Sequence, residues 1–277
     1  MPPRCFIIGH PVAHSRSPLI HGTWLAEHGL AGCYERVDVA PADLPGFVLR
    51  LRAGEFTGGN VTVPHKEAML PLVDEVSAAA RAIGAVNTLW SEGARICGDN
   101  TDVAGFLAHL DASAPGWDGK GGTALILGAG GAARGIAFGL KARGFDRIVL
   151  VNRSRRRADD LAAALGAPLV AADWAQRHAL VGEADLIVNT TALGMQGQPP
   201  LDLDLARLRP GTIVDDIVYV PLKTPLLVDA ERRGGVAVDG LGMLLHQAVP
   251  GFARWFGVTP AVTPALRALL EADILGH

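Results

Sequence analysis

The 277-residue sequence is poor in cysteine and lacks the spacings typical of a metal site. Cys5, Cys33 and Cys97 are scattered and form no C-x-x-C pair, which is typical of reduced thiols in a cytoplasmic protein. The nine histidines form no H-E-x-x-H motif. His10 and His14 are four residues apart, but Pro11 lies between them, so they are not expected to share a helix face. We therefore expect reduced thiols and no metal.

A strong excess of one charge and a long apolar run are also missing. The formal net charge is −3, whereas nucleic-acid-binding proteins usually carry a basic surplus. No apolar run approaches the roughly 20 residues that cross a bilayer, and the apolar stretch near the N-terminus is too short for a signal peptide. With 49% hydrophobic residues, the composition favours a globular protein with a substantial core. We expect neither nucleic acid nor a membrane as a partner.

Short apolar runs alternate with helical patterns along the whole chain, which predicts βα units and parallel sheets. The tail is expected to form two helices over 241–275, broken near 258–260. The expected strands are 5–9, 34–39, 59–63, a hairpin of 85–90 and 95–98, 123–127, 147–151, one near 169, 185–189, 212–215 and 236–238; the other expected helices are 17–30, one from 64 or 65, 44–53, 101–110, 132–142, 155–165 and 225–233.

Residues 111–122 are rich in glycine and small polar residues, so they predict a loop near a domain break. We expect an α/β protein with an N-terminal α/β domain over 1–101 and a Rossmann-type doubly wound domain over 102–239, with the active-site cleft between them. The helices of 240–277 have no strands to pair with and are expected to fold back on the first domain.

The clearest motif follows the apolar run that ends at Leu127. Gly128, Gly130 and Ala133 fit G-x-G-x-x-G/A, and a helical pattern follows. The first glycine permits a tight turn, the second lets a pyrophosphate approach the backbone, and the third small residue lets the helix pack on the strand. The helix start presents N–H groups and a positive dipole end to phosphate. This context favours a dinucleotide site over a plain βα turn.

The strand after the glycine turn ends near Asn152 and Arg153. NAD sites usually carry an acidic residue there for the ribose 2′-hydroxyl, whereas an arginine accommodates the 2′-phosphate of NADP. Three arginines at 155–157 follow at a helix start, where each cation opposes the helix dipole by about 0.3–1 kcal/mol. A bound phosphate would reverse that penalty. The pattern favours NADP over NAD, and the alternative for these arginines is a solvated helix face.

Polar loops follow two later strands, at 189–195 and at 216–219. Ligands of open α/β sheets lie at this carboxyl edge, and the alternative is that both loops are plain connections. In the first domain, Ser15 and Ser17 lie beside a helix start, where two hydroxyls suit a carboxylate. The alternative is that Ser17 caps the helix before Pro18. There is no G-x-S-x-G, so neither serine is expected to act as a nucleophile.

Lys66 lies near an expected helix start, a position that tunes a lysine for acid–base chemistry, although most lysines are surface residues. Asn87 interrupts or ends an expected strand, where asparagine is disfavoured. Asp102 lies just before a helix, and the alternative to a functional role is that it or Thr101 is the N-cap.

Taken together, these strings resemble the shikimate dehydrogenase family nearly end to end. The motifs that carry the resemblance are Gly9–Pro18 (GHPVAHSRSP), Asn60–Glu67 (NVTVPHKE), Gly84–Thr88 (GAVNT), Gly98–Asp102 (GDNTD), Gly128–Arg134 (GAGGAAR), Asn152–Ser154 (NRS) and Gly240–Leu244 (GLGML) with Gln247.

The resemblance implies reduction of 3-dehydroshikimate to shikimate with NADPH, in chorismate and aromatic amino-acid biosynthesis. It implies that Lys66 and Asp102 are the catalytic pair. The implied substrate-binding residues are Ser15 and Ser17, which match the serines that bind the carboxylate, and Thr62, Lys66, Asn87, Asp102, Tyr219 and Gln247. The implied NADP-binding residues are Gly128, Ala129, Gly130, Gly131, Ala132, Asn152, Arg153, Ser154, Arg157, Thr190, Ile217 and Gly240.

In the implied mechanism, hydride reaches the C3 carbonyl carbon while the Lys66 ammonium protonates the oxygen, and Asp102 keeps Lys66 charged and oriented. Closure of the cleft is expected to assemble the site. A quinate/shikimate dehydrogenase and a non-catalytic NADP-binding regulatory protein are the alternatives. The expected partner is a small-molecule substrate, and the expected state is a monomer or a homodimer.

The arginines after the second strand of the dinucleotide domain lead to a prediction of cofactor preference. Because Arg153 and its neighbours suit a 2′-phosphate, kcat/KM is expected to be higher with NADPH than with NADH. Initial-rate measurements with each cofactor test this, and equal values of kcat/KM would contradict it.

Overall fold

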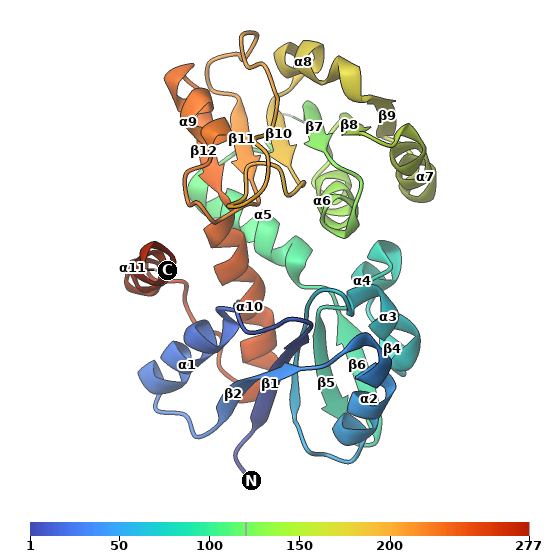
Figure 1. Cartoon of the computed structure of the whole chain (residues 1–277), viewed down its shortest axis with the longest axis vertical. Helices are drawn as coiled ribbons and strands as arrows, with labels where there is room; N and C mark the ends of the chain where they lie inside the picture. Colours follow the sequence, from blue (N-terminus) through green and yellow to red (C-terminus); the bar gives the residue numbers. More distant parts are fainter. Residues whose placement is uncertain (120, 277) are drawn as a thin grey trace. The chain divides into compact units, whose positions relative to one another are not determined.

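Two six-stranded sheets organise the chain, each within a unit of its own (Figure 1). The computed structural model describes residues 1–119 and 121–276. The first unit comprises Met1–Gly105 with Leu245–Asp273. The second comprises Phe106–Leu244 with the residues from Ile274 onward. Among the described residues, no helix has both the length and the apolar character needed to cross a membrane.

The first sheet is mixed. Its strand order is β2-β1-β3-β5-β6-β4, with β3–β5 and β5–β6 antiparallel and the other neighbours parallel. The expectation of parallel sheets is therefore wrong for the central part of this sheet, whereas the expected hairpin is present as β5–β6. The strands are β1 Arg4–Gly9, β2 Cys33–Asp38, β3 Gly58–Val61, β4 Glu75–Val76, β5 Thr88–Glu92 and β6 Arg95–Asp99.

Helices cover both faces of the first sheet. Successive residues of β1 point to opposite sides of the sheet, so its apolar side chains need a covering helix on each side. Phe6 and Ile8 of β1 pack with residues of α2, α3 and α4, whereas Cys5 and Ile7 pack with Trp255 of α10 (Figure 1). The Trp255 indole also donates to the Leu89 carbonyl at 2.9 Å. The helices of this region are α1 Ser17–Glu27, α2 Leu44–Arg52, α3 Lys66–Met69, α4 Ala78–Ile83, α10 Gly240–Phe256 and α11 Pro264–Leu275.

The second sheet is wholly parallel, with the order β12-β11-β10-β7-β8-β9. This is the doubly wound order of dinucleotide-binding folds, and it confirms the predicted Rossmann-type fold. Its strands are β7 Thr123–Leu127, β8 Arg147–Asn152, β9 Leu169–Asp173, β10 Leu186–Asn189, β11 Ile213–Asp216 and β12 Val236–Asp239.

Two apolar clusters sandwich the second sheet. Ala124 and Ile126 of β7 pack with α5, α6 and α7, whereas Leu125 and Leu127 pack with α8 and α9 (Figure 1). Strands buried on both faces have continuous apolar sequences, which is the pattern that β7, β8 and β10 show. The helices are α5 Asp102–Ser113, α6 Gly131–Ala142, α7 Arg155–Leu165, α8 Arg177–Leu180 and α9 Pro225–Arg232.

Several element boundaries differ from the predictions. Helix α5 continues to Ser113, so the loop expected from 111 begins later. Residues 85–87 lie outside β5, because Ala85 N donates to Ala80 O and Val86 N to Lys66 O instead of extending the β5 ladder. Helix α4 and strand β4 were missed, although the Ser77 hydroxyl caps α4 by accepting from Ala80 N at 3.1 Å. Such a serine before a run of alanines is a recognisable helix-start signal.

Two glycines of the first unit should respond oppositely to alanine. A Cβ on Gly59 of β3 would lie 2.3 Å from the Phe6 carbonyl oxygen, so Gly59→Ala should destabilise the protein by about 1–3 kcal/mol or more. A Cβ on Gly22 of α1 would meet nothing within 4 Å, so Gly22→Ala should stabilise it by about 0.5–1 kcal/mol. Urea unfolding of both variants measures these changes, and a neutral Gly59→Ala would contradict the described packing of β1 on β3.

Candidate functional site

A lysine and an aspartate from separate helices meet in the first unit. Lys66 is the first residue of α3 and Asp102 is the first residue of α5. The Lys66 Nζ atom lies 2.6 Å from Asp102 Oδ2. Their side chains are 29% and 23% exposed, so the pair is sheltered from water yet accessible to a ligand. A charged donor and acceptor at this distance form a strong hydrogen bond and a possible proton-transfer centre.

Asn87 completes the coordination of the Asp102 carboxylate. The Asn87 amide donates to Asp102 Oδ1 at 2.9 Å, so each carboxylate oxygen has its own donor. The side-chain oxygen Asn87 Oδ1 accepts from Thr101 N at 2.8 Å and from the Thr88 hydroxyl at 2.9 Å, which fixes the orientation of the amide. Because both oxygens of Asp102 are held, its carboxylate has one defined orientation toward Lys66.

Asp102 does not cap its helix through its side chain. Instead, Asn100 Oδ1 accepts from Asp102 N at 3.1 Å, and Asn100 Nδ2 donates to Ala85 O at 3.1 Å. The buried Asn100 thus anchors the start of α5 and leaves the Asp102 carboxylate for Lys66 and Asn87. The predicted alternative that Asp102 is the N-cap is therefore wrong, because another side chain satisfies the backbone at this turn. Thr101, the other residue of that alternative, directly precedes the helix, and its carbonyl oxygen accepts from Gly105 N at 2.9 Å.

A buried polar chain extends this cluster into the sheet. The Tyr34 hydroxyl donates to Asn60 Oδ1 at 2.6 Å, and Asn60 Nδ2 donates to Asn87 O at 3.1 Å and to the Thr88 hydroxyl at 3.2 Å. The fully buried His21 ring stacks on Tyr34 with 4.0 Å between ring centres. Burial lowers the pKa of His21 to about 3, so its ring is neutral. Tyr34 was not predicted as a site residue. Asn60 begins the Asn60–Glu67 motif but was given no role of its own, although asparagine inside a strand is an unusual choice.

The two serines lie at the start of α1. Ser15 Oγ accepts from Ser17 N at 3.3 Å, and Ser17 is 3% exposed. Arg16 is the residue that precedes the helix, and no side chain caps it. The alternative prediction that Ser17 is the N-cap is therefore wrong, since the helix begins at Ser17 itself.

The remaining predicted substrate residues fall in both units. Thr62 directly follows β3, whose last residue, Val61, donates to Asn87 O at 2.8 Å. Gln247 of α10 is 9% exposed and lies against Gly105, where an added Cβ would be 2.6 Å from the Gln247 Cβ. Tyr219 lies in the second unit, in the loop after β11.

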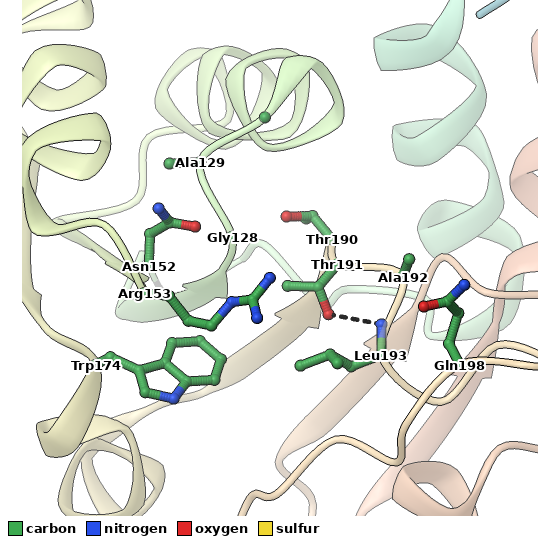
Figure 2. Close-up of a pocket in the computed structure, with 11 residues that line it drawn as sticks. Gly128, Ala129, Asn152, Arg153, Trp174, Thr190, Thr191, Ala192, Leu193 and Gln198 are labelled. Atoms are coloured by element: carbon green, nitrogen blue, oxygen red, sulfur yellow. Dashed lines mark hydrogen bonds between the residues drawn. The ribbon is translucent and has the colours of Figure 1, made fainter.

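A separate pocket of about 220 Å³ lies in the second unit, at the carboxyl ends of β7, β8 and β10 (Figure 2). The predicted residues that line it are Gly128, Ala129, Gly130, Asn152, Arg153 and Thr190. Gly131, Ala132, Ser154, Arg157, Ile217 and Gly240 were also predicted but do not line this pocket. Thr191, Ala192 and Leu193 also line it and belong to the 189–195 loop, which was predicted as a candidate ligand edge without roles for these three residues. Trp174 and Gln198 line it and were not predicted.

The glycine turn explains the shape of this pocket. Gly128 has φ of +115°, and a Cβ there would lie 2.4 Å from the Thr190 hydroxyl oxygen. Only glycine therefore allows β7 and the loop after β10 to come this close. In contrast, a Cβ on Gly130 or Gly131 would meet nothing within 4 Å. The open space lies at the N-terminus of α6, where backbone N–H groups suit a phosphate.

The arginines after β8 divide into two groups. Arg155 pairs with Asp159 and Asp173, and Arg156 pairs with Asp160. In the part of the chain that the structure describes, Arg153 and Arg157 have no carboxylate partner. Figure 2 shows the Arg153 side chain reaching from the end of β8, above Trp174, toward Thr190 and Thr191. Arg155 and Arg156 thus match the solvated-face alternative, whereas Arg153 is placed to bind an anion.

The buried side chain of Asp216 supports the loop after β10, whose residues Thr191 and Leu193 line the pocket. Asp216 accepts from Asn189 Nδ2 at 2.9 Å and from the Thr224 hydroxyl at 2.7 Å. Asn189 in turn accepts from the Thr191 hydroxyl at 2.7 Å and donates to Leu193 O at 3.1 Å. The loops after β10 and β11 are therefore tied together. Loops that only connected secondary-structure elements would need no such buried network, so it argues against the alternative that both loops are plain connections.

Comparison with known proteins gives the same assignment for each region. The family model described as the shikimate dehydrogenase substrate binding domain matches residues 7–89. The model described as shikimate / quinate 5-dehydrogenase matches 112–195, and the model of the shikimate 5′-dehydrogenase C-terminal domain matches 240–270.

Curated relatives match over nearly the full length. Shikimate dehydrogenase (NADP(+)) of Azorhizobium caulinodans is 55% identical over 98% of this chain and 96% of its own. The protein of the same name from Methylobacterium radiotolerans is 56% identical over 99% of this chain and 98% of its own.

Solved structures show the same fold. Shikimate 5-dehydrogenase of Thermus thermophilus, in complex with NADP(H) and shikimate, has a TM-score of 0.87 and 37% identity, covering 98% of this chain and 99% of that one. Quinate dehydrogenase of Corynebacterium glutamicum, in complex with NAD, has a TM-score of 0.90 and 31% identity, covering 97% and 98%.

The buried carboxyl of Asp215 should give the protein a characteristic pH dependence. Burial, with Asp216 and Asp239 nearby, raises the pKa of Asp215 well above its usual range. The unfolded chain releases this proton near pH 4, whereas the folded chain retains it to higher pH. Stability should therefore fall as pH rises above about 4, by up to about 1.4 kcal/mol per pH unit from this group.

Asp215→Asn removes that proton and should flatten the fall in unfolding free energy between pH 5 and 8. Urea unfolding at several pH values measures the slope. Asp160→Asn, at an exposed position of α7, is the matched control and should leave the slope unchanged. The same slope in Asp215→Asn and the parent protein would contradict the raised pKa.

Proposed function

The chain belongs to the shikimate dehydrogenase family, and from this we propose that it catalyses the reversible, NADP-dependent reduction of 3-dehydroshikimate to shikimate. This reaction is a step of chorismate and aromatic amino-acid biosynthesis. The observation that carries the proposal is the Lys66–Asp102 pair, with 2.6 Å between Nζ and Oδ2, held by Asn87. The chemistry belongs to the first unit, and NADP binding belongs to the second.

The residues present fit NADP. The open N-terminus of α6 at Gly130 and Gly131 suits the pyrophosphate, and Arg153 and Arg157 have the charge that a 2′-phosphate requires. Asn152 and Ser154 lie at the same strand end, where Asn152 Nδ2 donates to Ser154 O at 2.9 Å. NADPH, when bound, supplies the hydride for the reaction.

Lys66 handles the proton. Its ammonium stabilises the negative charge that grows on the C3 oxygen of 3-dehydroshikimate and then donates a proton to it. Asp102 orients Lys66 through the 2.6 Å contact between Oδ2 and Nζ, and it accepts a hydrogen bond from the neighbouring substrate hydroxyl. Asn87 prevents the Asp102 carboxylate from rotating away. In the oxidative direction, neutral Lys66 takes the proton of the alcohol.

Ser15 and Ser17 bind the substrate carboxylate, and Thr62, Asn87 and Gln247 contact the ring. Tyr219 is assigned to the substrate on the family resemblance alone, since it lies in the second unit. A cytoplasmic location is proposed from the three cysteines, which form no disulfide in the described residues. The state of a monomer or a homodimer stays a prediction.

A four-way assay tests the function. Oxidation of shikimate and of quinate is measured with NADP⁺ and with NAD⁺, and shikimate with NADP⁺ should give the highest kcat/KM. Faster oxidation of quinate with NAD⁺ would instead identify a quinate/shikimate dehydrogenase. No oxidation of shikimate with NADP⁺ would favour a non-catalytic NADP-binding protein.

Replacement of the proposed general acid should remove most of the rate. Lys66→Ala is expected to lower kcat about 10²–10⁴-fold, because general acid catalysis typically accelerates a reaction by about this factor. KM should stay within a few-fold of the parental value. Steady-state kinetics in both directions measures the change. Lys141→Ala, an exposed lysine at the end of α6, is the control and should keep the parental kcat. If Lys66→Ala retained most of its kcat, Lys66 would have no part in the proton transfer.

A further inference from the structure

The loop from β1 to α1 carries Ser15 and is tied to the neighbouring strand β2. His10 Nδ1 lies 2.7 Å from Asp38 Oδ1, and Val12 N donates to Asp38 Oδ2 at 3.3 Å. Arg36 lies two residues before Asp38, so both side chains stand on the same face of β2. One face of this strand therefore holds the loop at several points.

Arg36 makes the contact nearest to the serines. Its Nε atom donates to the Ser15 carbonyl oxygen at 2.9 Å and its Nη2 atom donates to the same oxygen at 2.6 Å. Two donors from one planar group fix this carbonyl in direction as well as in position. Since the Ser15 hydroxyl belongs to the same residue, its orientation toward Ser17 depends on that backbone anchor.

The charges around this loop are not equivalent. Arg16, between the two serines, pairs with Asp273 of α11 at 2.8 Å between Nε and Oδ2. For Arg36, no carboxylate partner is present among residues 1–119 and 121–276. Asp38, on the same strand face, contacts His10 and not Arg36, with 2.7 Å between Oδ1 and His10 Nδ1. Among the described residues, Arg36 therefore directs its donors to the Ser15 carbonyl and not to a carboxylate.

We propose that Arg36 is a positioning residue for the substrate carboxylate, acting through Ser15. It holds the Ser15 backbone so that the hydroxyls of Ser15 and Ser17 face one anion. The inference rests on the proposed function, because it takes the carboxylate of shikimate as the anion that the two serines bind.

Steady-state kinetics of Arg36→Gln, Arg36→Lys and a control variant tests the proposal. Arg36→Gln should raise KM for shikimate about tenfold, which is the effect of losing one charge-assisted contact. Its kcat and its KM for NADP⁺ should stay within about threefold, because neither hydride nor proton transfer involves Arg36. Arg36→Lys should lie between, since lysine keeps the charge without the planar pair of donors. The control is Arg4→Gln, an exposed ion-paired arginine of the same sheet, which should resemble the parent protein.

A double-mutant cycle with Ser15→Ala separates positioning from general loss of structure. If Arg36 acts through the Ser15 hydroxyl, Arg36→Gln should raise KM no more than about threefold further in the Ser15→Ala background. An equal tenfold rise in both backgrounds would overturn the proposal, as would an unchanged KM in Arg36→Gln. A combined rise in KM for NADP⁺ and a lower melting temperature would indicate a structural role only.

The parent protein in the same experiment reports on the proposed function. Failure of the parent to oxidise shikimate with NADP⁺ contradicts the function itself. Normal oxidation by the parent together with an unchanged KM in Arg36→Gln contradicts only the role of Arg36.

Discussion

The polar site of the first unit depends on one carboxylate with both oxygens engaged. Asp102 accepts from Lys66 on one oxygen and from Asn87 on the other. Asn87 is itself fixed by Thr101 and by the Asn60 contact to its carbonyl, so the constraint reaches from α5 through the sheet to Tyr34. A partly buried network is strong only when all of its members are satisfied. This requirement explains why so many amides and hydroxyls lie inside an otherwise apolar sheet.

The second unit solves a different problem, the close approach of backbone to a phosphate. Gly128 allows β7 to touch the loop after β10, and the open space at Gly130 and Gly131 leaves the N-terminus of α6 accessible. The buried Asp216 then ties the loops after β10 and β11 through Asn189 and Thr224. The side of the pocket at the glycine turn is thus shaped by the lack of side chains, and the side at the loop after β10 is shaped by a hydrogen-bonded network.

Much of this could be predicted from the sequence, for identifiable reasons. The parallel sheet was legible because its strands are buried on both faces, and the glycine turn because its spacing follows from pyrophosphate geometry. Lys66 and Asp102 were identified by family motifs, since their meeting depends on contacts 36 residues apart in the chain. Arg36 and Trp174 gave no local signal, because a charged residue on a strand and a tryptophan after one are common on surfaces. The end of α1 was misjudged because a local stop signal was overlooked: Gly29 adopts φ of +60°, and Leu30 N donates to Leu25 O at 3.0 Å. Helix α5 likewise continues to Ser113, shortly before the turn at Gly116, where φ is +80°.

The central claim is that Lys66 and Asp102 act as one chemical unit. The most direct test is kcat for Lys66→Ala, Asp102→Asn and the double variant, with shikimate and NADP⁺ saturating. If Asp102 acts through Lys66, the double variant should have a kcat within a few-fold of that of Lys66→Ala alone, because residues that act as a unit are strongly non-additive. Losses that multiply in the double variant would show that the two residues act independently and would contradict the account.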